Sequence, residues 1–346
     1  MLTFEEQKEV INKVFSPEHD KEYFNGLFAR GTPEEQEFNK EYILNVFTHR
    51  LYLFTPSQEF TDFVELHKEL FGEDSISLVM KADLAENKIK GTYGHHSNLW
   101  IDELNSVLRN DNKDKFIELC TQFPECVEAK YTIFHKHFIS IVELTMMFNA
   151  IGCFKYLVSS ELIDIGKSYN LGRYIVMSGN LEIYRIVQQN GYIETRTEQI
   201  LSEAIKRHEN DIAKYTYMNY GTIRNISRLI RDCADEYNYE LIPFFLENRE
   251  DTNSELSCDC IAEYIKHILL LINLINKYDM KILHDWLPHI DTLIKHPYTA
   301  EQLITIFEKL PMGLMDRREL EKGCLTKSEK YNKPKEYIDK LINFFQ

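Results

Sequence analysis

Four stretches of the chain repeat one pattern at intervals of 30, 29 and 29 residues, and this repeat constrains the fold more than any other feature. They begin at Ile151, Leu181, Asn210 and Tyr239. Each stretch has apolar side chains at helical spacing, and a second helical pattern precedes it. The equivalent pairs in the preceding patterns are Thr145-Met146, Ile175-Val176, Ala204-Ile205 and Cys233-Ala234. Because one short helix pair cannot bury its apolar face alone, the repeat predicts stacked pairs, an α-solenoid.

Weaker copies of the pattern flank these four stretches. One covers Phe116 to Cys120, and another begins at Ile282 after a polar interval that we interpret as an inserted loop. The segment from Tyr337 to Phe345 is apolar on one side of a helix, and we expect it to cap the stack. The predicted parts are a helical N-terminal domain (1–97), a repeat solenoid (98–310) and C-terminal capping helices (311–346).

Helix start signals and the scarcity of turn residues predict an all-α fold. The segments Thr3–Glu6 and Thr32–Glu35 both match a capping box ahead of apolar residues at helical spacing. The 346 residues include only 13 glycines and 9 prolines, too few for the turns of a β-sandwich or for several βαβ units. We interpret Gly91 to Asn98 as the linker between the first two predicted domains.

The segment from Asn170 to Gly191 resembles an ankyrin repeat. Ser178-Gly179-Asn180 is similar to that family's turn between two helices, and the stretch ends in Asn-Gly as the family's second helix does. The segment from Ser140 to Asn149 resembles the first helix, with Ser140 as its cap. The likeness is strongest to divergent ankyrin-like proteins that are abundant in some parasitic protists, and it covers roughly residues 98–248. It implies stacked helix pairs that bind protein partners.

The chain also departs from the ankyrin pattern. The position that usually holds histidine is occupied by Glu143, Arg173, Ser202 and Arg231. Because the interval is shorter than the family's usual repeat, we expect short loops in place of projecting β-hairpins. Pro243 is expected beyond the first turn of its helix, where proline is costly, so that copy fits least well.

The resemblance places partner binding on the inner face, formed by the first helices of the pairs. The residues predicted to bind a partner are Leu144, Met147, Phe148, Tyr174, Met177, Lys206 and Arg207. An exposed apolar patch of this kind commonly marks an interaction site, and methionine packs adaptably around a partner. The alternative is that the N-terminal helices or a neighbouring repeat cover the patch.

We therefore expect a non-catalytic protein–protein interaction module, an adaptor or recognition scaffold, in a monomer or weak homo-oligomer. No phosphate-binding loop, zinc-protease motif or nucleophile-elbow motif occurs in the sequence, so no enzymatic activity is predicted. Two alternatives stay open. One is an enzyme or effector whose catalytic site lies in residues 1–97, with the repeats selecting its substrate. The other is a structural subunit that forms homo-oligomers through the apolar stripe.

Charge and hydropathy argue against nucleic acid and membrane as main ligands. The formal net charge is −15, and its field repels phosphate backbones and anionic lipids. The longest apolar run, Ile268 to Ile275, is far shorter than the roughly 20 residues of a membrane span. The first ten residues carry acids where a signal peptide needs basic ones, so we expect a cytoplasmic protein and leave the nucleus open.

The seven cysteines are interpreted as reduced and mostly buried thiols. Cys153 aligns with apolar residues of the other copies, so we expect it in the core. Cys258 and Cys260 stand near His267, and His135 and His137 form another pair, but neither group matches a zinc site. We expect no metal and no cofactor.

Overall fold

The structure of the protein is a computed structural model. It describes residues 2–16, 20–51, 58–72, 90–91, 99–133, 136–160, 162–168, 170–220, 226–248, 255–256, 270, 273–274, 277, 281–282, 294–295, 299–309 and 317–346. These residues are mainly α-helical, as predicted, with a few short strands among them. Contacts divide the chain into two units, Phe47–Gly221 and the combination of Met1–Val46 with Thr222–Gln346. Both predicted domain boundaries fall outside the described residues and stay predictions.

The unit Phe47–Gly221 consists mostly of short helices. Its elements are α4 (Gln58–Phe71), β1 (Lys90–Gly91), α6 (Leu99–Arg109), α7 (Lys113–Gln122), α8 (Glu125–Glu128), β2 (Tyr131–Ile133), β3 (Lys136–Ile139), α9 (Ile141–Met147), α10 (Ile151–Ser159), α11 (Leu171–Met177), α12 (Leu181–Gln189), α13 (Thr197–Arg207) and α14 (Asn210–Tyr220). Each of the helices α9, α11 and α13 contacts the helix that follows it. We call these three the first helices and α10, α12 and α14 the second helices.

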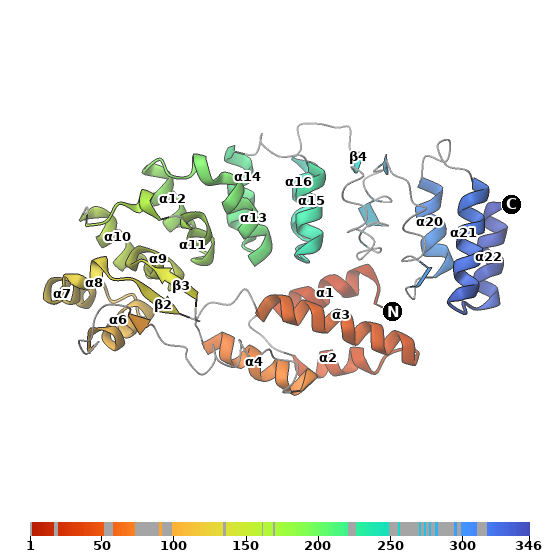
Figure 1. Ribbon diagram of the computed structural model, residues 1–346, viewed down its shortest axis with the longest axis horizontal. Helices are drawn as coiled ribbons and strands as arrows, with labels where there is room; N and C mark the ends of the chain where they lie inside the picture. The colour runs from red at the N-terminus through yellow and green to blue at the C-terminus, as the bar shows by residue number, and fades with distance from the viewer. Residues whose placement is uncertain are drawn as a thin grey trace. The chain divides into compact units, whose positions relative to one another are not determined.

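The helix pairs stack on one another in sequence order (Figure 1). Helix α11 contacts α9 on one side and α13 on the other, and the second helices contact one another in the same order. Upstream, α7 pairs with α6 and contacts α10. The aligned apolar positions Cys153, Ile183 and Ile212 are buried, as predicted, so each pair hides its apolar side against its neighbours.

The turn inside each pair contains one residue with a left-handed backbone. These residues are Asp111, Asn149, Gly179 and His208, with φ between 44° and 61°. After α9, the N–H of Ala150 donates to the carbonyl of Thr145 at 2.8 Å, and after α13 the N–H of Glu209 donates to that of Ala204 at 3.0 Å. This is the Schellman motif, which satisfies the last carbonyls of a helix. The accepting residues are those that the internal alignment places in equivalent positions.

A β-hairpin stands where short loops were expected. Strands β2 and β3 pair in antiparallel fashion between α8 and α9, and β1 pairs with β2. The turn residues Asp111 and Asn149 on either side are 38 positions apart, against 30 between Asn149 and Gly179. The longer interval provides the residues for the hairpin. After α10 and α12, the described residues form 3₁₀ turns at Ile165–Lys167 and Glu194–Arg196, as the shorter period predicts.

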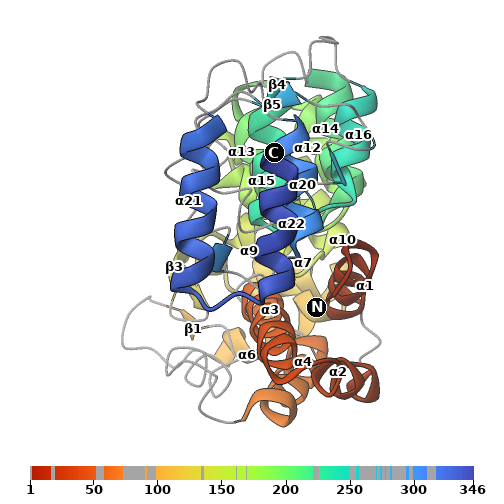
Figure 2. The same ribbon diagram turned by 90° about the vertical axis from the view of Figure 1, so that its right-hand side faces the viewer.

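The second unit contains both predicted capping boxes and the last helices of the chain. Its elements are α1 (Phe4–Phe15), α2 (Lys21–Phe28), most of α3 (Pro33–Leu51), α15 (Ile226–Asp235), α16 (Leu241–Glu247), β4 (Glu255–Leu256), β5 (Lys281–Ile282), α20 (Ala300–Lys309), α21 (Arg317–Lys330) and α22 (Lys335–Phe345). Thr3 and Glu6 form the predicted capping box, and so do Thr32 and Glu35. Helix α22 contacts α20 and α21, and the three lie together in Figure 2.

Two expectations about this unit were wrong. Helix α16 begins at Leu241, so Pro243 lies in its first turn, where a missing N–H breaks no helical hydrogen bond. Ile282, the start of the weak downstream copy, lies in β5, which pairs in parallel with β4. Residues 283–293, which include the rest of that copy, lie outside the described residues.

Candidate functional site

Most of the predicted partner-binding residues do not form an exposed apolar patch. The exposed fraction is 0% for Leu144, 5% for Met147 and 8% for Tyr174. Phe148, Met177 and Lys206 are half-buried. The exposure that the prediction requires is therefore missing at the centre of the patch. This burial agrees with the alternative that other parts of the chain cover that face.

Charged residues of the first helices are paired with one another. The carboxylate of Glu143 accepts hydrogen bonds from Ser140 N at 2.8 Å and from Ser168 Oγ at 2.5 Å. Nε of Arg207 lies 2.7 Å from Oε1 of Glu203. Burial lowers the pKa of Arg207, while Glu203 acts in the opposite direction and stabilises the cation. Arg207, also a predicted partner-binding residue, is therefore already neutralised within the chain.

The turns of successive pairs contact one another and form a row. We call this surface the turn row and define it as residues 111–112, 149–150, 179–180 and 208–209. The carboxylate of Asp111 accepts the N–H of Gly152 at 2.9 Å and that of Cys153 at 3.1 Å, so it caps α10. Nδ2 of Asn180 donates to Oδ1 of Asn149 at 2.9 Å. Polar side chains thus join one turn to the next.

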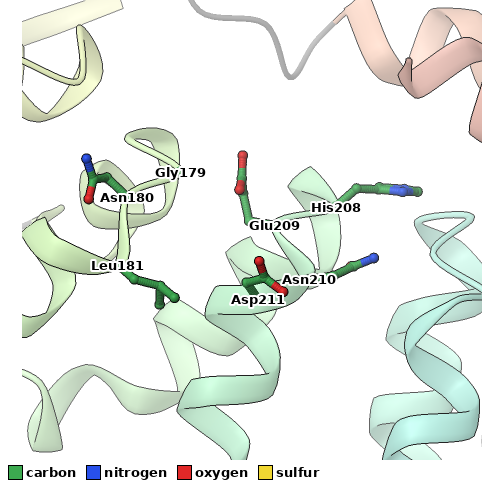
Figure 3. A pocket seen from close by; sticks show the side chains of 7 residues that line it. All are labelled: Gly179, Asn180, Leu181, His208, Glu209, Asn210 and Asp211. Atoms are coloured by element: carbon green, nitrogen blue, oxygen red, sulfur yellow. The ribbon is translucent and has the colours of Figure 1, made fainter. Parts of the chain in front are cut away.

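A pocket of about 360 Å³ opens between the turns of α11–α12 and α13–α14 (Figure 3). Its lining residues are Gly179, Asn180, Leu181, His208, Glu209, Asn210 and Asp211. The Glu209 side chain rises between the two turns, whereas His208 and Asn210 point away from Gly179. A Cβ atom at position 179 would lie 3.2 Å from Oε1 of Glu209. Glycine therefore gives this carboxyl group its room.

Glu209 is the titratable group of this pocket with the clearest perturbation. Burial raises its pKa to about 7, and Asp211 adds to the rise, while Arg207 opposes it. The carboxyl group therefore changes charge near neutral pH. Carboxyl, amide and imidazole groups line the pocket, and these groups suit hydrogen bonding to polar or cationic atoms of a ligand.

His67 is the histidine of the first hundred residues that bears on the enzymatic alternative. It is fully buried on α4, with ring centroids 6.0 Å from Phe47 and 5.1 Å from Phe71. Burial lowers its pKa to about 4, so the imidazole is neutral at physiological pH. Aromatic packing accounts for its position without a catalytic role.

The predicted metal-ligand candidates lie largely outside the described residues. This applies to Cys258, Cys260, His267 and His135. In the described part of the chain, no group of three His, Cys, Asp or Glu side chains is arranged to hold a metal ion. Nor does any helix of that part have both the length and the apolar character needed to cross a membrane. Five cysteines are described, and all are free and buried, as predicted.

The sequence prediction missed the residues of the turn row. A signal for them was present, because Asn149 and Gly179 are residues that readily adopt left-handed backbone and stand one repeat apart. Glu209 gave no such signal, since a glutamate beside other charged residues is usually exposed.

Comparisons with family models, with curated proteins and with solved structures each find no match to this chain. The resemblance to ankyrin repeats therefore rests on the residues of the chain itself.

Proposed function

We infer that this chain is a non-catalytic protein-binding module made of ankyrin-like helix pairs, and that its partner contacts the turn row. The observation that carries the proposal is the recurrence of one turn at intervals of 30 and 29 residues, with Asn149, Gly179 and His208 in equivalent places. A stack of pairs presents its turns side by side, and such extended surfaces suit the recognition of another protein.

The predicted partner-binding residues that remain accessible lie next to this row. Phe148 precedes Asn149, and Met177 and Lys206 each stand two residues before a left-handed residue. Their half-exposed side chains supply apolar and basic contacts beside the polar pocket. Binding is thus proposed at the ends of the first helices, and the buried residues Leu144, Met147 and Tyr174 support the stack instead.

The ankyrin-like character of the module draws support from local details. Ser140 and Glu143 form a capping box at the start of α9, where the family likeness predicts a cap. The turn from Ser178 to Asn180 contains Gly179 with φ 61°, and Asn180 caps α12 by accepting the N–H of Glu182. Both observations agree with a family template in which a short turn joins the two helices.

The test is co-purification from cell extract with two charge-changing variants and two matched controls. Met177→Glu and Lys206→Glu alter accessible side chains beside the turn row. Met218→Glu alters an exposed methionine on α14, and Lys115→Glu an exposed lysine on α7, both outside the row.

Proteins that co-purify with the unaltered chain and with both controls, but not with the two row variants, would support the proposal. Equal recovery with all four variants would refute it. Circular dichroism melting establishes that each variant remains folded, and light scattering establishes whether a second copy of the chain is itself the partner.

A further inference from the structure

Two buried thiols meet where α7 leads into α8. The Sγ–H of Cys126 donates to Sγ of Cys120, and the two sulfur atoms are 3.7 Å apart. A disulfide requires an S–S distance of about 2 Å, so the sulfurs need only a small approach to form one. Helix α8 is only four residues long, and a slight shift of so short a helix can supply this movement.

The environment gives the two thiols different roles. The exposed fraction is 6% for Cys120 and 0% for Cys126, so Cys120 is the more accessible of the two. The hydrogen bond from Cys126 lowers the pKa of Cys120, and the same contact raises the pKa of Cys126. The thiolate is the reactive form of cysteine, so Cys120 is suited to attack an oxidant. Cys126 is then in place to react with the oxidised sulfur.

We propose that Cys120 and Cys126 form a redox-active dithiol that a hydroperoxide converts into an intramolecular disulfide. The Cys120 thiolate attacks the terminal peroxide oxygen, the O–O bond breaks, and the departing oxygen takes up a proton. With hydrogen peroxide this releases one water and leaves Cys120 as a sulfenic acid. The Cys126 sulfur attacks the Cys120 sulfur, the S–O bond breaks, and the hydroxyl group leaves as water with the Cys126 proton. Two thiols lose two electrons, and the peroxide accepts them.

Three other buried cysteines provide internal comparisons. Burial raises the pKa of Cys153 and Cys233, and it raises that of Cys324 to about 12. None of these three has a recorded hydrogen bond to a neighbouring thiol that would stabilise its thiolate. The proposal therefore predicts oxidation confined to one pair among the described cysteines, and it does not depend on the proposed partner binding.

The experiment treats the full-length reduced protein with hydrogen peroxide under native conditions. The remaining thiols are then alkylated with N-ethylmaleimide after unfolding in urea, and the chain is digested with trypsin. Cleavage after Lys115 and Lys130 yields one peptide, Phe116 to Lys130, that contains both cysteines of the pair. The disulfide form of this peptide is two hydrogen atoms lighter than the reduced form and carries no alkyl group.

We expect this lighter peptide to accumulate at least tenfold faster than any oxidised form of Cys153 or Cys324. In the Cys126→Ser variant, dimedone should trap the sulfenic acid at Cys120, whereas Cys120→Ser should leave Cys126 reduced. The proposal is overturned if the peptide stays doubly alkylated, if Cys120 links to Cys153, or if all described thiols oxidise at one rate. Since the unaltered chain alone gives these three readings, the test stands even if a serine variant fails to fold.

Discussion

Nδ2 of Asn180 lies 2.9 Å from Oδ1 of Asn149, so the turn of one helix pair is hydrogen-bonded to the turn of the next. The two residues are one repeat apart, and each is part of a turn with a left-handed residue. Stacking of the pairs therefore involves polar contacts at the turns as well as apolar burial between helices. Several consequences of this arrangement can be measured.

Gly179→Ala should destabilise the chain. Its φ of 61° disfavours any residue with a Cβ, by about 1–2 kcal/mol, and the new Cβ would also lie 3.2 Å from Oε1 of Glu209. Gly26→Ala is the matched control, because Gly26 lies inside α2 with no atom within 4 Å of a new Cβ. That control should gain about 0.5–1 kcal/mol. Urea denaturation measures both changes, and a loss of equal size in both variants would contradict the account.

Asp111→Asn should weaken the contact between two neighbouring pairs. Asparagine tolerates the left-handed backbone, but it has one acceptor oxygen and no charge for the N–H groups of Gly152 and Cys153. We expect a loss of about 1–2 kcal/mol in the free energy of unfolding. Asp114→Asn, at an exposed acid in the first turn of α7, should lose only a few tenths of that scale. Indistinguishable stabilities of the two variants would show that the cap across the pairs contributes nothing.

Glu209→Gln should make the chain more stable at neutral pH. The folded pKa of about 7 is above the usual 4.5, so the folded state holds its proton where the unfolded state has lost it. The free energy of unfolding therefore falls as pH rises from 4.5 to 7. Glutamine stays neutral, so the advantage of the variant should grow across this window to the order of 2 kcal/mol. An advantage that does not change with pH would contradict the shifted pKa.

His67→Phe should change the response to acid in the opposite window. The folded pKa of about 4 lies below the usual 6.5, so the unfolded state binds a proton more readily between these values. Stability contributed by the neutral imidazole is present above pH 6.5 and is lost as pH falls toward 4. The difference in melting temperature between the variant and the unaltered chain should therefore widen in favour of phenylalanine over this range. Parallel melting curves at all pH values would exclude this role of His67.

The internal repeat allowed the helix pairs to be predicted with their register. Thr145 and Ala204 were aligned by sequence, and their carbonyls make the same hydrogen bond in two turns. Local signals sufficed because a capping box or a left-handed glycine depends on residues close in sequence. The hairpin of β2 and β3 was missed because the alignment gave no information on the longer interval ahead of α9.

The candidate site was harder to predict than the fold. Helical spacing shows that Leu144 and Met147 lie close to one side of a helix, but it does not show whether another element covers that side. The prediction assumed a free inner face by analogy, and the structure has these side chains buried. Glu209 was missed because its burial arises from packing between two turns that are 30 residues apart.

The most direct test of partner binding at the turn row is site-specific photo-crosslinking. Benzoylphenylalanine placed at Lys206, beside the row, is compared with the same group at Lys115, an exposed lysine on α7 away from it. We predict that irradiation in cell extract links a protein to position 206 and not to position 115. No linked protein at position 206, or the same proteins at both positions, would contradict the account.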